Sequence, residues 1–203
     1  MNVIFLDIDG VMNSQDMYIR ESNTFKRKLR SKWLWLKYTP RWIFTGSRSK
    51  VYSLVNYKAP AYTKTFEYTY KRLVEGTDKK KWLWLSEFCN RTGTKICISS
   101  CWKWHFSGDP ELNDEGWSKS FDKLGFINDT FVGITGKRQT LRGDEIKNWI
   151  LKEGDIERYA IIDDDSDMLP EQMGSFFHVD GYYGLSPNTL YRIGRHFGKP
   201  EDC

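Results

Sequence analysis

Short apolar runs alternate with longer amphipathic stretches along most of this chain. Four runs of strand length occupy Val3–Leu6, Lys95–Ser99, Tyr159–Ile162 and Phe176–Val179. Runs of this length that are mainly apolar on both faces indicate strands buried inside a sheet. A further short strand is predicted at Phe131–Ile134.

Between these runs, apolar residues recur at spacings of three and four, which predicts helices with one buried face. In Lys79–Arg91 this face carries Trp82, Leu85 and Phe88, and Gly93 is suited to end the helix. The same periodicity predicts helices over three other ranges: Trp117–Leu124, Gly143–Lys152 and Asn188–Phe197.

Strands that alternate with helices imply parallel βαβ units, and therefore an α/β fold with a Rossmann-like, doubly wound parallel sheet. In such sheets the ligand site lies beyond the carboxyl ends of the strands. Three predicted strand ends carry polar side chains that we expect to converge on one crevice. They are Asp7 with Asp9, Ser99 with Ser100, and Asp163 with Asp164.

One segment interrupts this alternation with a different composition. The stretch Ser22–Phe66 contains no Asp or Glu but eleven Lys or Arg, interleaved with aromatic residues, although the net charge of the 203-residue chain is only +4. We expect a cap insert over 15–79 and a core formed by 1–14 and 80–203. Such charge asymmetry favours a polyanionic partner. Alternatively, the aromatic residues pack a small cap core and the basic residues form a solvated face.

Other features of the sequence narrow the class of protein. The chain has no run of about 18 apolar residues, so no membrane-spanning helix is expected. Met1–Gly10 is interrupted by acidic residues and is interpreted as a buried strand rather than a signal peptide. The four cysteines form no CxxC pair, which favours free thiols in a cytoplasmic protein. No obligate protein partner is indicated.

Two carboxylates stand where the first predicted strand ends, at Asp7 and Asp9, followed by Gly10. Neighbouring carboxylates raise each other's pKa unless a cation neutralises them. A hard cation such as Mg²⁺ binds carboxylate, carbonyl and water oxygens. One carboxylate could then attack phosphorus while the other transfers a proton. The alternative is that Asp9 and Gly10 only form a turn.

Three more groups have the chemistry of a phosphate site. The predicted strand Tyr159–Ile162 ends in Asp163–Asp165, and an N-cap role explains one of these acids but not three. At the end of another strand, the hydroxyl of Ser99 or Ser100 can bind a phosphate oxygen. Arg142 precedes a predicted helix, where its charge can offset phosphate and aspartate.

In chain order these groups are an acidic pair, a hydroxyl, a basic residue and an acidic cluster. This order, with the sequences DIDGV, ICISS, RGDEI and IIDDD, resembles the four motifs of the haloacid dehalogenase (HAD) superfamily. The resemblance covers about residues 1–14 and 80–190 and does not cover the insert. SSCWK, GITG and VDGYYGLS are similar to the HAD domains of Swiss Army Knife RNA repair proteins and phage relatives.

The resemblance implies a role for each motif residue. Asp7 would be the nucleophile that forms an aspartyl-phosphate, and Asp9 would be the general acid and then the general base. Ser99, or alternatively Ser100, would bind a phosphate oxygen. The implied ligands of Mg²⁺ are Asp7, the backbone carbonyl of Asp9, and Asp163 or Asp164.

Arg142 stands where the superfamily usually has lysine, which keeps the charge and changes the geometry. Lys137 or Lys147 is therefore an alternative for this role. The residues expected to bind the substrate or its phosphate are Gly10, Ser100, Lys103 and Lys147.

The function expected from this resemblance is a Mg²⁺-dependent phosphomonoester hydrolase. Because basic and aromatic side chains together bind single strands, the expected substrate is a phosphorylated nucleic acid end. The alternatives are a nucleotidase acting on nucleoside monophosphates, a phosphotransferase, and a nucleic-acid-binding protein with a silent core. The presence of both Asp7 and Asp9 argues against the last. No GxxxxGK[ST] loop occurs, so a polynucleotide kinase is not expected.

Overall fold

A computed structural model of the chain describes residues 1–17, 66–127, 129–136 and 141–199. The predicted cap insert lies mainly outside these residues, so the division of the chain into core and cap stays a prediction. The end of its predicted range is described and contains helix α4 (Phe66–Gly76), whose Leu73 is fully buried.

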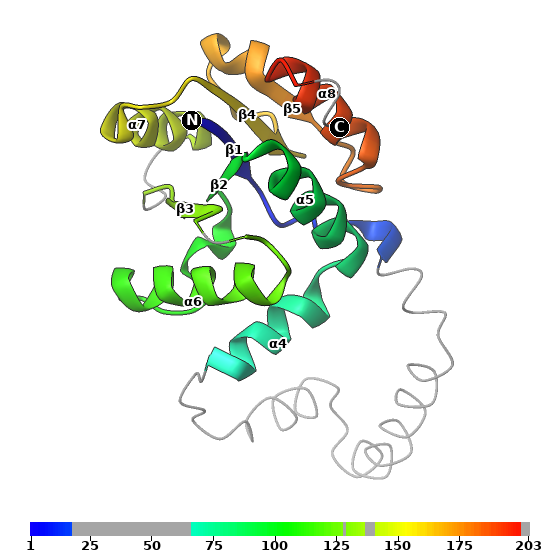
Figure 1. Cartoon of the computed structure of the whole chain (residues 1–203), viewed down its shortest axis with the longest axis vertical. Coiled ribbons are helices and arrows are strands. Elements are labelled where there is room, and N and C mark those ends of the chain that lie inside the picture. Colours follow the sequence, from blue (N-terminus) through cyan, green and yellow to red (C-terminus); the bar gives the residue numbers. More distant parts are fainter. Residues whose placement is uncertain (18–65, 128, 137–140, 200–203) are drawn as a thin grey trace, which may run out of the picture. The chain divides into compact units, whose positions relative to one another are not determined.

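The described residues form a five-stranded, all-parallel sheet with the order β3-β2-β1-β4-β5 (Figure 1). This arrangement confirms the predicted α/β fold with a parallel sheet. Each predicted strand is found within a residue or two of its expected bounds. The strands are β1 (Asn2–Leu6), β2 (Lys95–Ile98), β3 (Phe131–Ile134), β4 (Arg158–Asp163) and β5 (Phe176–His178).

The remaining helices are α5 (Lys79–Thr92), α6 (Pro110–Lys123), α7 (Arg142–Glu153) and α8 (Pro187–His196), with 3-10 helices η1 (Cys101–Trp104) and η2 (Pro170–Ser175). Gly93 ends α5 in the left-handed conformation, as predicted. Helix α6 begins seven residues before its predicted start because the carboxylate of Asp109 caps it, accepting from the N–H of Leu112 at 3.1 Å. Its first two turns are mostly polar, so apolar periodicity did not indicate them.

The sheet is buried on both faces, which explains why its strands are apolar runs. Alternate residues of each strand point to opposite faces. One face packs against α5, α6 and α8 and forms the larger core, with Ile4 and Ile96 of the strands and Trp82, Trp117 and Ile193 of the helices. The other face packs against α7, with Val3, Phe5, Cys97, Ile146 and Trp149.

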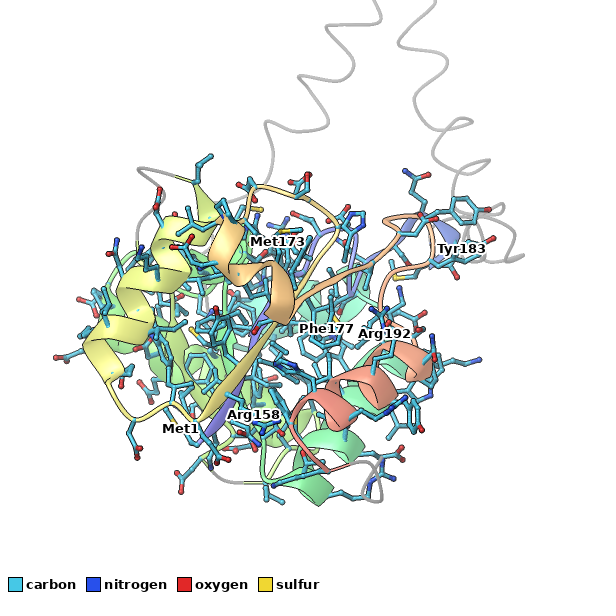
Figure 2. All side chains as sticks on the ribbon, turned by 90° about the horizontal axis from the view of Figure 1, so that it is seen from above. Met1, Arg158, Met173, Phe177, Tyr183 and Arg192 are labelled. Atoms are coloured by element: carbon cyan, nitrogen blue, oxygen red, sulfur yellow. The ribbon has the colours of Figure 1, made fainter. Side chains whose placement is uncertain are left out.

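The edge strand β5 shows how α8 is attached to the sheet. Phe177 is buried in the larger core, and the guanidinium of Arg192 lies 5.5 Å from the centre of its ring (Figure 2). Next to it, the ring of His196 is 5.5 Å from that of Phe177 and hydrogen-bonds to the backbone carbonyl of Tyr159. Apolar and polar contacts thus hold the last described helix against two neighbouring strands.

The strand register brings three distant parts of the chain to one edge of the sheet. Leu6 pairs with Ile98 of β2 and with Ile162 of β4. The next residue continues both ladders: the N–H of Asp7 donates to the carbonyl of Ile162 at 3.0 Å, and the N–H of Ser99 donates to that of Leu6 at 2.9 Å. The predicted convergence of these strand ends is therefore present.

In the part of the chain that the structure describes, no helix combines the length and apolarity needed to cross a membrane. Three of the cysteines lie in this part, and all three are free thiols. Cys89 and Cys97 are buried and Cys101 is exposed.

Candidate active site

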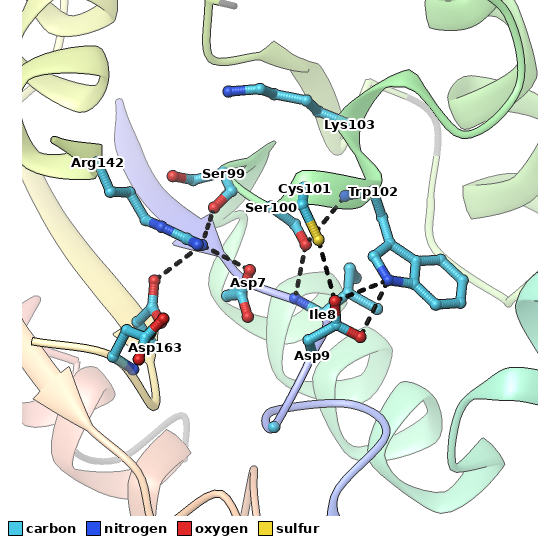
Figure 3. Close-up of polar contacts among 12 residues, drawn as sticks. Asp7, Ile8, Asp9, Ser99, Ser100, Cys101, Trp102, Lys103, Arg142 and Asp163 are labelled. Atoms are coloured by element: carbon cyan, nitrogen blue, oxygen red, sulfur yellow. Dashed lines mark hydrogen bonds and ion pairs between the residues drawn. The ribbon is translucent and has the colours of Figure 1, made fainter. Parts of the chain in front are cut away.

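The centre of the site is the carboxylate of Asp7, which is 3% exposed at the carboxyl end of β1. Arg142, the first residue of α7, reaches it across the end of the sheet (Figure 3). Its Nη1 atom lies 2.5 Å from Oδ1 of Asp7 and 2.9 Å from Oδ2 of Asp163, and it also donates to the backbone carbonyl of Ser99. One cationic group therefore joins residues from the ends of β1, β2 and β4.

A single guanidinium faces two deeply buried carboxylates, so negative charge is in excess here. Burial raises the pKa of Asp7, although the charge and hydrogen bond of Arg142 oppose this shift. Burial, and then repulsion from Asp7, raise the pKa of Asp163 to about 8, again against the effect of Arg142. A second cation would allow both groups to ionise.

Three of the carboxylates lie close enough together to hold a metal ion. Oxygen atoms of Asp7, Asp163 and Asp164 all lie within 4.8 Å of one another. Within the described residues, Oδ2 of Asp163 is buried and accepts no hydrogen bond, since the nearby Arg142 makes an ion pair without hydrogen-bond geometry. An unsatisfied buried carboxylate oxygen beside two others fits a hard cation such as Mg²⁺.

The carboxylate of Asp164 occupies space that is open only because two neighbouring residues are glycines without a Cβ atom. Gly10 has a φ of +68°, and a Cβ built on it would lie 2.0 Å from Oδ2 of Asp164. A Cβ on Gly181, in the loop after β5, would lie 2.6 Å from the same oxygen. Gly10 was predicted to bind the substrate or its phosphate, and the structure places it against the carboxylate of Asp164, where any side chain would collide.

The carboxylate of Asp9 faces η1. Nε1 of Trp102 lies 3.0 Å from both of its oxygens, the thiol of Cys101 donates to Oδ2 at 3.0 Å, and Nδ2 of Asn13 donates to Oδ1 at 2.7 Å. Burial and the neighbouring Asp9 raise the pKa of Cys101 to about 11, so its thiol stays protonated at neutral pH. The side chain of Asp9 does not belong to the three-carboxylate group.

The two serines after β2 differ in their partners. The hydroxyl of Ser100 accepts from the backbone N–H groups of Ile8 and Trp102, each at 3.3 Å, and its hydrogen bond to Asp7 lowers the pKa of that carboxyl group. The hydroxyl of Ser99 is buried and has no hydrogen-bond partner among the described residues. The hydroxyl of Ser100 thus stabilises the loop after β2. The hydroxyl of Ser99 can instead accept a hydrogen bond from a ligand or donate one to it.

The two lysines predicted to bind the substrate lie in different surroundings. Nζ of Lys103 lies 2.5 Å from Oε2 of Glu145, with both side chains buried, and Thr135 donates to the same oxygen at 3.2 Å. Lys147 is exposed and pairs with Glu171 at 2.9 Å, which keeps it out of the cluster around Asp7. Lys137, the other alternative to Arg142, lies outside the described residues.

A cleft of about 360 Å³ adjoins the carboxylates. Its walls come from the loop after β2, from η1 and from the first turn of α7. The residues that line it are Ser99, Ser100, Cys101, Lys103, Trp104, Gly108, Arg142 and Glu145.

Four residues of the site were not expected from the sequence, namely Glu145, Trp102, Asn13 and Asp167. Glu145 stands three residues after Arg142, a spacing that places both on one face because α7 begins at Arg142, one residue before its predicted start. Asp167, whose carboxylate lies 4.0 Å from Nε of Arg142, stands close to the acidic cluster. Nothing in the sequence indicated that Trp102 and Asn13 would bond to Asp9.

The comparison with protein-family models gives a match over residues 3–190 to the HAD domain in Swiss Army Knife RNA repair proteins. The chain belongs to this family. Neither the curated proteins nor the solved structures contain a match.

Membership agrees with the geometry of this HAD domain. The four motifs that resemble those of the superfamily meet around Asp7. Three lie at the carboxyl ends of β1, β2 and β4, and the fourth lies at the start of α7. The HAD assignment supports a hydrolase of the phosphatase type.

Proposed function

We propose that this HAD domain is a Mg²⁺-dependent phosphomonoesterase that removes terminal phosphates from nucleic acid through an aspartyl-phosphate on Asp7. The observation that carries the proposal is the position of Asp7. Its carboxylate is buried against Arg142, beside two further carboxylates and the hydroxyl of Ser99, which has no hydrogen-bond partner among the described residues. This set combines a nucleophile with groups that bind a dianionic phosphate.

Asp7, Asp163 and Asp164 would hold the Mg²⁺ ion, with the backbone carbonyl of Asp9 as the further predicted ligand. When bound, the ion would neutralise carboxylate and phosphate charge, so that an anionic nucleophile and an anionic substrate can approach. The raised pKa of Asp163 and its unsatisfied Oδ2 atom support this assignment.

In the first half-reaction, an oxygen of Asp7 attacks phosphorus and forms an acyl-phosphate bond. The bond between phosphorus and the leaving oxygen breaks, and protonated Asp9 gives its proton to that oxygen, releasing an alcohol. Arg142 favours the ionised form of Asp7, because its positive charge opposes the rise in the pKa of that carboxyl group that burial causes.

In the second half-reaction, the ionised Asp9 removes a proton from water while the water oxygen attacks phosphorus. The bond between phosphorus and Asp7 breaks, which releases inorganic phosphate and restores the carboxylate. Ser99 and Arg142 would bind the phosphate oxygens in both steps, since a hydroxyl and a guanidinium offer donors close to Asp7.

The organic part of the substrate would lie in the cleft next to these groups. Its volume of about 360 Å³ is at the small end of the range of ligand pockets, which suits one nucleotide unit. The basic and aromatic composition of Ser22–Phe66 favours a longer strand as the substrate. A nucleotidase that acts on nucleoside monophosphates is the second candidate, because the cleft alone accommodates no more than one unit.

The decisive test compares purified wild type and Asp7→Asn on 3′- and 5′-phosphorylated oligonucleotides, nucleoside monophosphates and p-nitrophenyl phosphate, with Mg²⁺ or with chelator. We expect phosphate release that requires both Mg²⁺ and Asp7, with the highest kcat/KM for an oligonucleotide. A preference for monophosphates would instead select the nucleotidase. Release that is equal in Asp7→Asn would remove Asp7 as the nucleophile.

The covalent intermediate has its own test. Asp9→Asn keeps the nucleophile but lacks the base for the second half-reaction. We therefore expect mass spectrometry of Asp9→Asn, quenched in acid after mixing with p-nitrophenyl phosphate, to show one added phosphoryl group on the peptide that contains Asp7. Added alcohol acceptors that become phosphorylated would favour a phosphotransferase over a hydrolase.

A further inference from the structure

Asp9, the proposed general acid and base, accepts a hydrogen bond from an indole. The indole N–H of Trp102 lies 3.0 Å from both carboxylate oxygens, so it points at the middle of the group (Figure 3). We propose that Trp102 is a positioning residue that aims the carboxylate of Asp9 for proton transfer to the leaving oxygen. This inference rests on the proposed role of Asp9 as general acid and base.

The indole is itself held in place from several directions. Its ring stacks on that of His105, with ring centres 4.8 Å apart and an angle of 23° between the planes. His105 is in turn 3.2 Å from the backbone carbonyl of Thr69 in α4. At the end of α4, Gly76 lies so close that a Cβ there would approach Cη2 of Trp102 to 3.2 Å. A ring confined in this way can fix the direction of its N–H group.

The chemistry of indole suits this role. Its nitrogen is a donor only, so it can orient a carboxylate without removing the proton that the carboxylate must transfer. Asn13 completes the arrangement, because its amide donates to Oδ1 of Asp9 while its own oxygen accepts from the N–H of Gly10 at 2.9 Å. These contacts therefore restrict the rotation of the Asp9 side chain and fix the direction of its carboxylate before a substrate binds.

The consequence depends on the leaving group. In the first half-reaction, the proton of Asp9 is transferred as the bond from phosphorus to the leaving oxygen breaks. An alkoxide, such as that of a nucleoside, needs this proton, whereas p-nitrophenolate is a stable anion and leaves without it. Misplacing Asp9 should therefore lower the rate for substrates with an alkoxide leaving group and leave the rate for p-nitrophenyl phosphate nearly unchanged.

The experiment measures kcat/KM of Trp102→Phe for a nucleoside 3′-phosphate and for p-nitrophenyl phosphate, because this constant covers the steps up to leaving-group departure. We expect a fall of about 10- to 100-fold for the nucleotide and a change within about twofold for the aryl ester. Trp102→His, which keeps a ring N–H, should recover part of the loss.

Trp82→Phe is the matched control. It also removes an indole donor, since Nε1 of Trp82 donates to Thr77 at 2.8 Å, but it does not contact Asp9. We expect Trp82→Phe to affect both substrates equally. Circular dichroism checks the fold of each variant. In ¹⁵N-labelled protein, Asp9→Ala should shift the indole N–H resonance of Trp102 and leave that of Trp82 unchanged.

Equal losses for both substrates in Trp102→Phe, or no loss for either, would overturn the positioning role while leaving the phosphatase proposal standing. Failure of the phosphatase proposal gives a different result, because wild type itself would then release no phosphate or would not depend on Asp7. An unshifted Trp102 indole resonance in Asp9→Ala would also overturn the inference, independently of any activity.

Discussion

Arg142 and Asp7 are 135 positions apart in the chain, and Nη1 of the arginine lies 2.5 Å from Oδ1 of the aspartate. This contact joins the start of α7 to the end of β1. Within the described residues, Arg142 is the only cation that pairs with Asp7, and the contact places it in a group of buried carboxylates. Several expected properties of the protein depend on this balance of charge.

Removal of the guanidinium is expected to cost both activity and stability. Arg142→Ala leaves Asp7 and Asp163 buried without their partner, and breaking such a buried pair costs about 3–5 kcal/mol. Thermal unfolding in chelator should show this loss, and Mg²⁺ should restore part of it. Arg142→Lys keeps the charge that is usual in the superfamily, so it should retain more activity and stability than the alanine variant. Equal behaviour of the two variants would contradict a role based on charge.

Stability in chelator should fall as pH rises from about 4 to about 8. The pKa of Asp163 is raised to about 8 in the folded protein, above its value of about 3.9 in an unfolded chain. The folded state therefore binds the extra proton in this window, and its stabilising effect is lost as pH passes the folded pKa. Urea unfolding at several pH values measures the slope.

Asp163→Asn is the control for this pH dependence, because an amide of the same shape does not titrate. It should flatten the slope between pH 4 and 8. Saturating Mg²⁺ should also flatten it, since the ion stabilises the ionised carboxylate. A slope that is unchanged in Asp163→Asn would assign the effect to another group.

Gly181→Ala is expected to weaken Mg²⁺ binding while leaving the fold intact. The new Cβ would lie 2.6 Å from Oδ2 of Asp164, so this carboxylate must move. The Mg²⁺ concentration for half-maximal phosphate release should rise by about tenfold or more, which corresponds to a loss of about 1.4 kcal/mol in binding. In Gly174→Ala, where a Cβ would meet no atom within 4 Å, this concentration should not change.

The exposed tyrosines in the loop after β5 are expected to contribute to nucleic acid binding. Tyr183 is 64% exposed and Tyr182 is 40% exposed, and both follow Gly181 in the loop after β5. Figure 2 shows the position of Tyr183. Base stacking on an aromatic ring is worth about 1–3 kcal/mol, so Tyr183→Ala should raise KM for a phosphorylated oligonucleotide by about tenfold. KM for p-nitrophenyl phosphate should stay the same.

Tyr191→Ala is the control for the aromatic contribution. Tyr191 is 45% exposed on α8, so its replacement removes a similar ring from a different surface. If Tyr191→Ala and Tyr183→Ala raise KM for the oligonucleotide equally, the loop after β5 has no special role.

The sequence by itself determined the sheet and most of its helices. Parallel strands are buried on both faces, so they must be apolar runs, and the runs at β1, β2 and β4 end in the polar residues that form the site. Because the carboxyl ends of such strands meet at one edge, the proximity of Asp7, Ser99 and Asp163 could be predicted without coordinates. The first half of α6 was missed because its start depends on the cap at Asp109 rather than on apolar periodicity.

The tertiary structure alone decided which side chains pair. Trp102 and Asp9 are 93 positions apart, and Lys103 and Glu145 are 42 apart, so no local spacing indicates either contact. The same holds for the different environments of Ser99 and Ser100, which are neighbours in the chain. A hydrogen bond depends on atomic distances of about 3 Å, and these are set by packing of helices on the sheet rather than by residue type.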